Sequence, residues 1–222
     1  MSDAATPQAE TKRKPDVVVM DQLPEPGSRA ESPLHHANRD RLADTGTGPN
    51  GVQLRELKLL GHLVLRGSRD NPSFVSGVER VLGLALPQTL QSVESGERSL
   101  RWISPDEWLL VLPGKEAFQV ERQLREAILG HYAVVNVSGG QTLLELSGVR
   151  AIEVLRKSTG YAVDARNFPT GKVVTTTFAK TQAIIRRTAE TRWELVVRRS
   201  FADYLWRWLK DAAAEFGLSL SR

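Results

Sequence analysis

The 222-residue chain contains no cysteine and only four histidines. The lack of cysteine excludes disulfides, thiolate catalysis, iron–sulfur ligation and cysteine-based zinc sites. The histidines are too scattered to suggest a metal site, and they are His35, His36, His62 and His131. No apolar run approaches the ~18 residues of a membrane span, and the N-terminus has no signal-peptide core. We therefore expect a soluble, cytoplasmic protein with no membrane partner.

Aromatic residues are missing from residues 1–50, although the chain has five Trp, three Tyr and six Phe. The same stretch holds six of the eleven prolines and has a net charge of −2. Such a segment cannot bury enough apolar surface to offset the entropy cost of ordering it. We expect a flexible tail over 1–50, or an arm that orders on a partner, and one folded domain over 51–222.

The domain carries the basic character of the chain, with a net charge of +6 over residues 51–222. Because side chains alternate along a strand, Arg186-Arg187 and Arg198-Arg199 place one guanidinium on each face. Such doublets suit salt bridges or acidic partners. Nucleic-acid binding usually adds a stacking aromatic platform, which the sequence does not show, so we expect no nucleic-acid partner.

Hydrophobic periodicity from residue 51 predicts helices and strands in mixed order. Asn71-Pro72 is typical of a helix start, and Gly83 of a helix end. The last helix is expected to begin at Ser200 as N-cap, with Asp203 as a capping-box partner, and to reach Phe216. The other predicted helices span 115–129 and 149–157.

The predicted strands are short and separated by turn residues. Ser104-Pro105-Asp106-Glu107 suits a type I turn between two of them, and Ser138-Gly139-Gly140 suits a hairpin loop between two others. The segment from Leu54 to Leu65 has mixed periodicity and suggests an entry strand or a docking segment. The strands are expected at 99–103, 108–112, 132–137, 141–146, 172–179, 182–187 and 193–198. This order predicts an α+β fold with antiparallel or mixed sheets covered by helices.

Residues that could carry catalysis are hard to find, and we predict no catalytic, cofactor-binding or metal-binding residue in this chain. Asp106 and Glu107 are adjacent carboxylates, but neighbours in a turn point apart, which favours a structural role over acid–base catalysis. Ser138-Gly139-Gly140 and Ser147-Gly148 could offer backbone N–H groups to an anion, yet a loop and a plain helix start explain them equally well. His131 has no partner close in sequence.

The last helix has more apolar surface than one sheet needs. Its apolar arc spans about 200°, whereas a helix on a sheet usually needs a stripe of roughly 100° or somewhat more. Trp206 lies at the far edge of this arc, about 140° from Phe201 at 100° per residue. Trp206 then either lies flat on loops of its own domain or forms a contact with another subunit, since Trp is enriched at interfaces. We take Trp206 as a possible interface residue.

Several motifs together resemble the gamma subunit of heterotetrameric sarcosine oxidase. The resemblance covers about residues 74–217, in the right order. Its motifs are Leu82-Gly83-Leu84-Ala85-Leu86-Pro87, the stretch from Trp102 to Val111, Val135-Asn136-Val137-Ser138, Leu144-Glu145-Leu146-Ser147-Gly148, Phe168-Pro169-Thr170-Gly171, Trp193-Glu194-Leu195-Val196-Val197 and the stretch from Arg199 to Trp206. The strand–Leu-Ser-Gly–helix unit is also similar to the folate-binding domain of glycine-cleavage aminomethyltransferases, which implies a fold of that kind.

The resemblance implies a non-catalytic subunit that assembles with alpha, beta and delta subunits. The family's assembly oxidatively demethylates sarcosine to glycine and yields hydrogen peroxide with formaldehyde or methylenetetrahydrofolate. FAD, covalent FMN, NAD, zinc and tetrahydrofolate are expected on the other subunits and not on this chain. The alternative is a free-standing folate-binding or one-carbon transfer protein of the same fold. An iron–sulfur assembly factor of the related fold is excluded because its signature needs cysteine.

Overall fold

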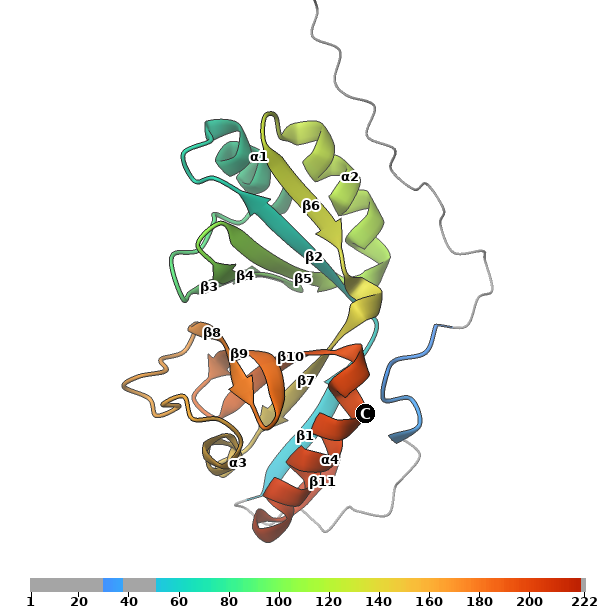
Figure 1. Ribbon diagram of the computed structural model, residues 1–222, viewed down its shortest axis with the longest axis vertical. Helices are drawn as coiled ribbons and strands as arrows, with labels where there is room; N and C mark the ends of the chain where they lie inside the picture. Colours follow the sequence, from blue (N-terminus) through green and yellow to red (C-terminus); the bar gives the residue numbers. More distant parts are fainter. Residues whose placement is uncertain (1–29, 38–50, 221–222) are drawn as a thin grey trace, which may run out of the picture. The chain divides into compact units, whose positions relative to one another are not determined.

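Two β-sheets lie face to face in the computed structural model of the chain, and helices cover the outer face of each sheet (Figure 1). The structure describes residues 30–37 and 51–220. Residues Glu31–Arg222 belong to one unit of the chain, and the description below concerns that unit. The predicted α+β class, with mixed and antiparallel sheets under helices, is confirmed.

One sheet has six strands in the order β11-β1-β7-β10-β9-β8. All of its strand pairs are antiparallel except β1 with β11, which makes this sheet mixed. Its strands are β1 (Val52–Leu57), β7 (Gln141–Ser147), β8 (Val173–Phe178), β9 (Thr181–Ala189), β10 (Arg192–Arg198) and β11 (Leu218–Leu220).

The other sheet has five strands in the order β3-β4-β5-β2-β6 and is antiparallel throughout. Its strands are β2 (Leu60–Gly67), β3 (Ser92–Ser95), β4 (Arg98–Ser104), β5 (Glu107–Pro113) and β6 (Tyr132–Asn136). An isolated bridge between Gln91 and Lys172 links the neighbourhoods of β3 and β8, so the two sheets are joined along one edge.

Four α-helices cover the outer faces. Helices α1 (Pro72–Leu82) and α2 (Ala117–Ala127) supply residues to the core of the five-stranded sheet. Helices α3 (Ala151–Ser158) and α4 (Ala202–Ala213) do the same for the six-stranded sheet. Figure 1 shows each pair on the side of its sheet that faces away from the other sheet.

Strand alternation divides the interior into three apolar clusters. Along β5, Trp108 and Leu110 pack under α1 and α2, whereas Leu109 and Val111 point into the layer between the sheets. Central strands are therefore buried on both faces, which explains why β5 reads as a nearly continuous apolar run.

The locally encoded predictions are confirmed. The Asn71 side chain accepts hydrogen bonds from the N–H groups of Ser73 and Phe74, with Pro72 at the first helical position. Gly83 ends α1 with a left-handed φ of 67°. The turn between β4 and β5 also lies where its sequence predicts it. Each of these features depends on a few neighbouring residues.

The predicted hairpin between residues 132–137 and 141–146 is wrong. Strand β6 pairs with β2 in one sheet, whereas β7 pairs with β1 and β10 in the other. The Ser138–Gly140 turn carries the chain from one sheet to the other, and its Ser138 Oγ accepts a hydrogen bond from the His62 N–H. Strand β7 is buried on both faces and has a partner strand at each edge. The short loop before β7 does not determine which strands these partners are.

The Leu54–Leu65 segment behaves in the same way. It forms β1 and β2, which belong to different sheets. Leu59 lies in the turn between them and has a left-handed φ of 55°. The chain therefore crosses between the sheets twice, at 58–59 and at 138–140, and this explains the mixed periodicity.

The end of the chain differs from its prediction in two ways. Ser200 does not cap α4, because a 3-10 turn over Arg199–Phe201 precedes the helix, and the Ala202 N–H bonds to the Arg199 carbonyl. After the helix, β11 adds a short parallel strand beside β1 that periodicity did not indicate. Three residues are too few to show a strand period.

Part of the expected tail packs on the domain. Leu34 is fully buried in the core of the six-stranded sheet, the Ser32 hydroxyl donates to Glu56 Oε2 at 2.6 Å, and His36 bonds to Asp203 of α4 at 2.9 Å. This segment, residues 31–37, therefore differs from the flexible tail expected over 1–50. A single leucine and a serine are enough to hold the segment on the domain, because the apolar core receives Leu34 and Glu56 accepts from Ser32. Residues 1–29 and 38–50 lie outside the described residues.

We predict that Gly148→Ala lowers the free energy of unfolding by about 2–3 kcal/mol. Gly148 has a φ of 111°, and a Cβ there would lie 2.2 Å from the Gly51 carbonyl oxygen. Urea unfolding followed by tryptophan fluorescence measures the change. The control is Gly139→Ala, whose Cβ would meet no atom within 4 Å, with an expected change within about 0.5 kcal/mol. Equal effects of the two substitutions would contradict the strain at Gly148.

Candidate functional site

The layer between the sheets is organised in rows across the six-stranded sheet. Residues of a row lie opposite one another on adjacent strands. The first row is charged and contains Arg55, Glu145, Glu194 and Arg186. The second row is apolar and contains Leu57, Leu143, Val196 and Ile184. The third row is polar and includes Gln141 and Arg198.

Ion pairs made by two buried arginines connect the charged row to the other sheet. Arg101 of β4 is 1% exposed, and its Nη2 lies 2.5 Å from Glu194 Oε2 of β10. Arg186 of β9 pairs with Glu94 of β3 and lies 3.4 Å from the same Glu194 oxygen. Each arginine therefore contacts an acid of the opposite sheet. We refer to Arg101, Arg186, Glu94 and Glu194 as the cross-sheet cluster.

Burial lowers the pKa of Arg101 to about 10, and the neighbouring Glu194 carboxylate opposes that shift. The guanidinium therefore stays charged at neutral pH. Pairing in such a place roughly offsets the cost of removing both charges from water, while loss of one partner typically costs 3–5 kcal/mol. The cross-sheet cluster thus specifies how the two sheets pair, and its charges are committed to one another.

His62 lies in the same layer, on the inward face of β2. Its side chain is 1% exposed, and neither ring nitrogen has a hydrogen-bond partner among the described residues. Burial, and to a lesser extent the positive charge of Arg101, lower the pKa of His62 to about 4. The imidazole is therefore neutral at pH 7. It packs like an apolar side chain, and neither ring nitrogen forms a hydrogen bond with the described residues.

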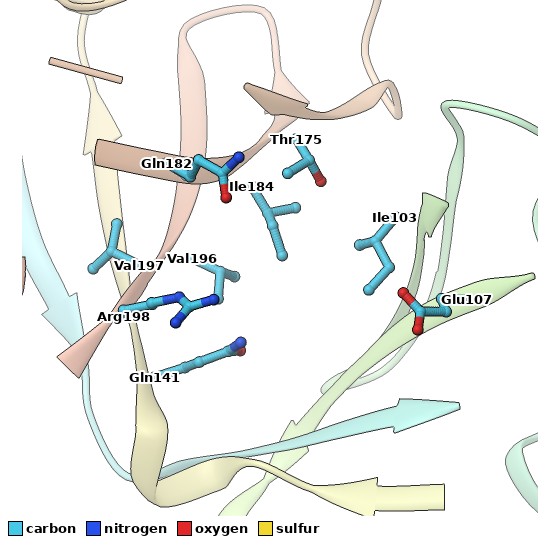
Figure 2. Close-up of a pocket in the computed structure, with 10 residues that line it drawn as sticks. Ile103, Glu107, Gln141, Thr175, Gln182, Ile184, Val196, Val197 and Arg198 are labelled. Atoms are coloured by element: carbon cyan, nitrogen blue, oxygen red, sulfur yellow. The ribbon is translucent and has the colours of Figure 1, made fainter. Parts of the chain in front are cut away.

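A pocket of about 220 Å³ opens where the layer between the sheets ends (Figure 2). Its apolar side chains include Ile103 from the five-stranded sheet and Ile184 and Val196 from the six-stranded sheet. Its polar lining residues are Glu107, Gln141, Thr175, Gln182 and Arg198. In Figure 2, Glu107 lies on one wall and Arg198 and Gln141 lie on the other.

Two polar groups of this pocket lack partners. Arg198 is exposed and forms no ion pair among the described residues. The Gln141 Oε1 atom is buried and accepts no hydrogen bond within the same part of the chain. Sequence reasoning singled out Arg198 only as one of a doublet and missed Gln141. The signal was strand alternation, which places both on one face, but the opposite wall could not be known.

The expectation that the two adjacent carboxylates point apart is wrong, because Asp106 and Glu107 share the Ser104 hydroxyl and the Arg66 guanidinium as partners. Asp106 accepts a hydrogen bond from Arg66 Nε at 3.0 Å, and this bond holds the pKa of Asp106 below its usual range. Glu107 lines the pocket and accepts from the Ser104 hydroxyl at 3.2 Å. Only one of the pair therefore faces a cavity. His131 is exposed and does not line this pocket.

Neither glycine-containing turn presents a free anion-binding face. Ser138 N–H and Oγ both bond to Asn136 Oδ1, at 3.1 and 2.6 Å. The Gly148 N–H donates to the Thr191 carbonyl at 3.0 Å, and helix α3 begins only at Ala151. In both turns these N–H groups therefore form hydrogen bonds within the chain.

Of the two alternatives for Trp206, the structure favours cover by its own domain. Its side chain is 3% exposed and belongs to the core of the six-stranded sheet, together with Leu34 from the 31–37 segment. Most of the wide apolar arc is thus covered within the chain, while Phe201 stays 40% exposed. Trp206 offers little surface to another subunit in this arrangement.

Within residues 30–37 and 51–220, no cluster of three or more His, Asp or Glu side chains could hold a metal ion. No helix in this part of the chain is long and apolar enough to cross a membrane.

The architecture defines the class of protein first. It matches the aminomethyltransferase T of the glycine cleavage system from Bartonella henselae with a TM-score of 0.60 at 16% identity. The match covers 85% of this chain and 58% of that one. At this identity the likeness shows the fold alone, and it confirms the predicted aminomethyltransferase-like fold.

Closer relatives define the family. Residues 66–215 match the model of the sarcosine oxidase gamma subunit family. The sarcosine oxidase subunit gamma of Corynebacterium sp. (strain P-1) is 32% identical over 197 residues, covering 87% of this chain and 95% of the relative. A similar relative from Corynebacterium sp. (strain U-96) is 30% identical over 192 residues, covering 83% and 90%. The chain belongs to the sarcosine oxidase gamma subunit family.

A solved structure agrees with this assignment. One chain of the heterotetrameric sarcosine oxidase from Corynebacterium sp. U-96, in complex with pyrrole 2-carboxylate, matches with a TM-score of 0.77 at 27% identity. The match covers 87% of this chain and 99% of that chain.

Stability is predicted to fall as the pH drops from about 6.5 toward 4 because of His62. The unfolded imidazole has a pKa of 6.5, whereas that of the folded one is about 4, so the unfolded state binds more protons in this window. His62→Leu is expected to shrink the loss of unfolding free energy between pH 7.5 and 4.5 by about 2–3 kcal/mol. Urea titrations at both pH values measure it. The exposed His131→Leu is the control and is expected to change nothing; equal curves for all three proteins would refute the prediction.

Trp206→Ala is predicted to destabilise the isolated chain by about 3–5 kcal/mol, because it removes a buried indole from the core. Phe201→Ala, at a half-exposed position near the start of the same helix, is expected to cost under about 1 kcal/mol. Thermal and urea unfolding of both variants provide the comparison. A Trp206 variant as stable as the parent would show that the indole is not part of the core.

Proposed function

We propose that this chain is the non-catalytic gamma subunit of a heterotetrameric sarcosine oxidase and completes that assembly with alpha, beta and delta subunits. The family match over residues 66–215 carries the proposal. The relative from strain P-1 is covered over 95% of its length, which supports a whole subunit of the same kind. A cytoplasmic location is part of the proposal.

The inner layer supports a structural role. The charges of the cross-sheet cluster pair with one another across the sheets, so they hold the two halves of the domain in register. On the surface, several large apolar side chains are exposed and could lie against another subunit. They are Leu59, Leu129, Val135, Val149 and Phe201.

Under this proposal the assembly oxidises the N-methyl group of sarcosine and releases glycine. Oxygen accepts the two electrons and becomes hydrogen peroxide, and the methyl carbon leaves as formaldehyde or methylenetetrahydrofolate. FAD, FMN, NAD, zinc and tetrahydrofolate reside on the other subunits. The pocket between the sheets is not a candidate site for them, since its volume of about 220 Å³ is below the ~300–1,000 Å³ typical of drug-sized ligands. It does not fit a dinucleotide or a folate.

Co-expression of the full tagged chain with the other three subunits tests the proposal. We expect the chain to copurify with a flavoprotein complex that oxidises sarcosine, while the chain alone does not oxidise sarcosine. The control is the tag expressed with the same three subunits but without this chain. A well-behaved monomer that never copurifies with a flavoprotein would sink the proposal, as would sarcosine turnover by the chain alone.

The alternative, a free-standing folate-binding or one-carbon transfer protein, rests on the aminomethyltransferase-like fold. It requires micromolar affinity of the isolated full chain for tetrahydrofolate. Calorimetry distinguishes the two functions, because the assembly proposal expects no heat at millimolar ligand.

A further inference from the structure

The pocket between the sheets contains polar groups that the fold itself does not use. The Arg198 guanidinium has no acid within ion-pair distance among the described residues, although ten other arginines of this part of the chain have one. The buried Gln141 Oε1 has no donor there either. An unsatisfied buried acceptor typically costs about 1–3 kcal/mol, so Gln141 Oε1 calls for a hydrogen-bond donor. The exposed Arg198 guanidinium, on the neighbouring strand position, is free to pair with an anion.

The chemistry of these groups defines what such a ligand must carry. A planar guanidinium prefers a carboxylate, which it can bind through two parallel hydrogen bonds. The Gln141 oxygen needs a hydrogen-bond donor close to Arg198, because the two residues lie opposite each other on adjacent strands. Glu107, on the opposite wall, is also an acceptor and attracts a positively charged donor, and Ser104 and Arg66 fix its carboxylate at 3.2 and 3.7 Å. The ligand therefore carries a carboxylate and, close to it, a positively charged N–H donor.

Size and apolar lining restrict the ligand further. A pocket of about 220 Å³ admits a small molecule only, and Ile103, Ile184 and Val196 give it an apolar part. These three side chains belong to the apolar cluster between the sheets, so that part is built into the core. A short aliphatic group fits there, and a large aromatic one does not.

We propose that this pocket binds a small amino acid in its zwitterionic form. The carboxylate pairs with Arg198, and the ammonium group donates to Gln141 Oε1 and Glu107. This site is additional to the proposed role in assembly, which needs no small ligand.

Calorimetry of the full chain with glycine and alanine tests the proposal. We expect both amino acids to bind, with acetate and methylammonium each at least tenfold weaker, because each offers only one of the two charged ends. Tryptophan is the size control and is expected not to bind.

Two variants assign the binding to the pocket. Arg198→Gln and Gln141→Leu are each expected to weaken glycine binding at least tenfold, and circular dichroism confirms that they fold. The matched control is Arg199→Gln, which removes the other arginine of the doublet outside the pocket and is expected to keep the affinity of the parent.

Four results would overturn the proposal. The first three are no heat from the parent chain at 100 mM glycine, acetate binding as tight as glycine, and unchanged affinity in the Arg198 variant. The fourth is loss of subunit assembly in Arg198→Gln when the parent chain binds no glycine, because a side chain of a partner subunit would then occupy the pocket. Copurification with the flavoprotein is measured separately, so failure of this site and failure of the assembly role are distinguishable.

Discussion

The pairing of Arg101 with Glu194 is the interaction on which the arrangement of the two sheets depends. The two residues are 93 positions apart in the sequence, and each is fixed on a central part of its own sheet. A shift of one sheet against the other by one residue would leave a buried charge without its partner, which is more costly than the loss of an apolar contact. The apolar row beside them adds burial but little direction, so the charges determine the register.

The same strands produce the pocket. On β10, Glu194 is paired, Val196 is buried among apolar neighbours, and Arg198 is unpaired. Three successive inward-facing positions of one strand thus hold a paired charge, an apolar core residue and an unpaired charge. The pocket lies beyond the apolar row, at the end of the layer away from the cross-sheet cluster. The pocket is polar because its Arg198 lies beyond the last ion pair between the sheets.

Local signals predicted local structure, and non-local choices were missed. Asn71 and Gly83 bound α1 as expected because caps depend on adjacent residues. The hairpin failed because the partners of β6 and β7 lie in separate sheets. The sequence left the environment of Trp206 open because Leu34, a residue from a segment without aromatics, joins the same core. Class, most elements and family could be predicted from the sequence; the pocket could not, because its two walls come from different sheets.

The boundaries of the six-stranded sheet have a consequence for how the family is delimited. The matched span of residues 66–215 begins after β1 and ends before β11, yet both strands belong to that sheet, with β1 paired to β7 and β11 paired to β1. A fragment cut to that span would lack β1, so β7 would become an edge strand with exposed leucine side chains. The span that identifies the family is therefore shorter than the span that is needed to fold the complete six-stranded sheet.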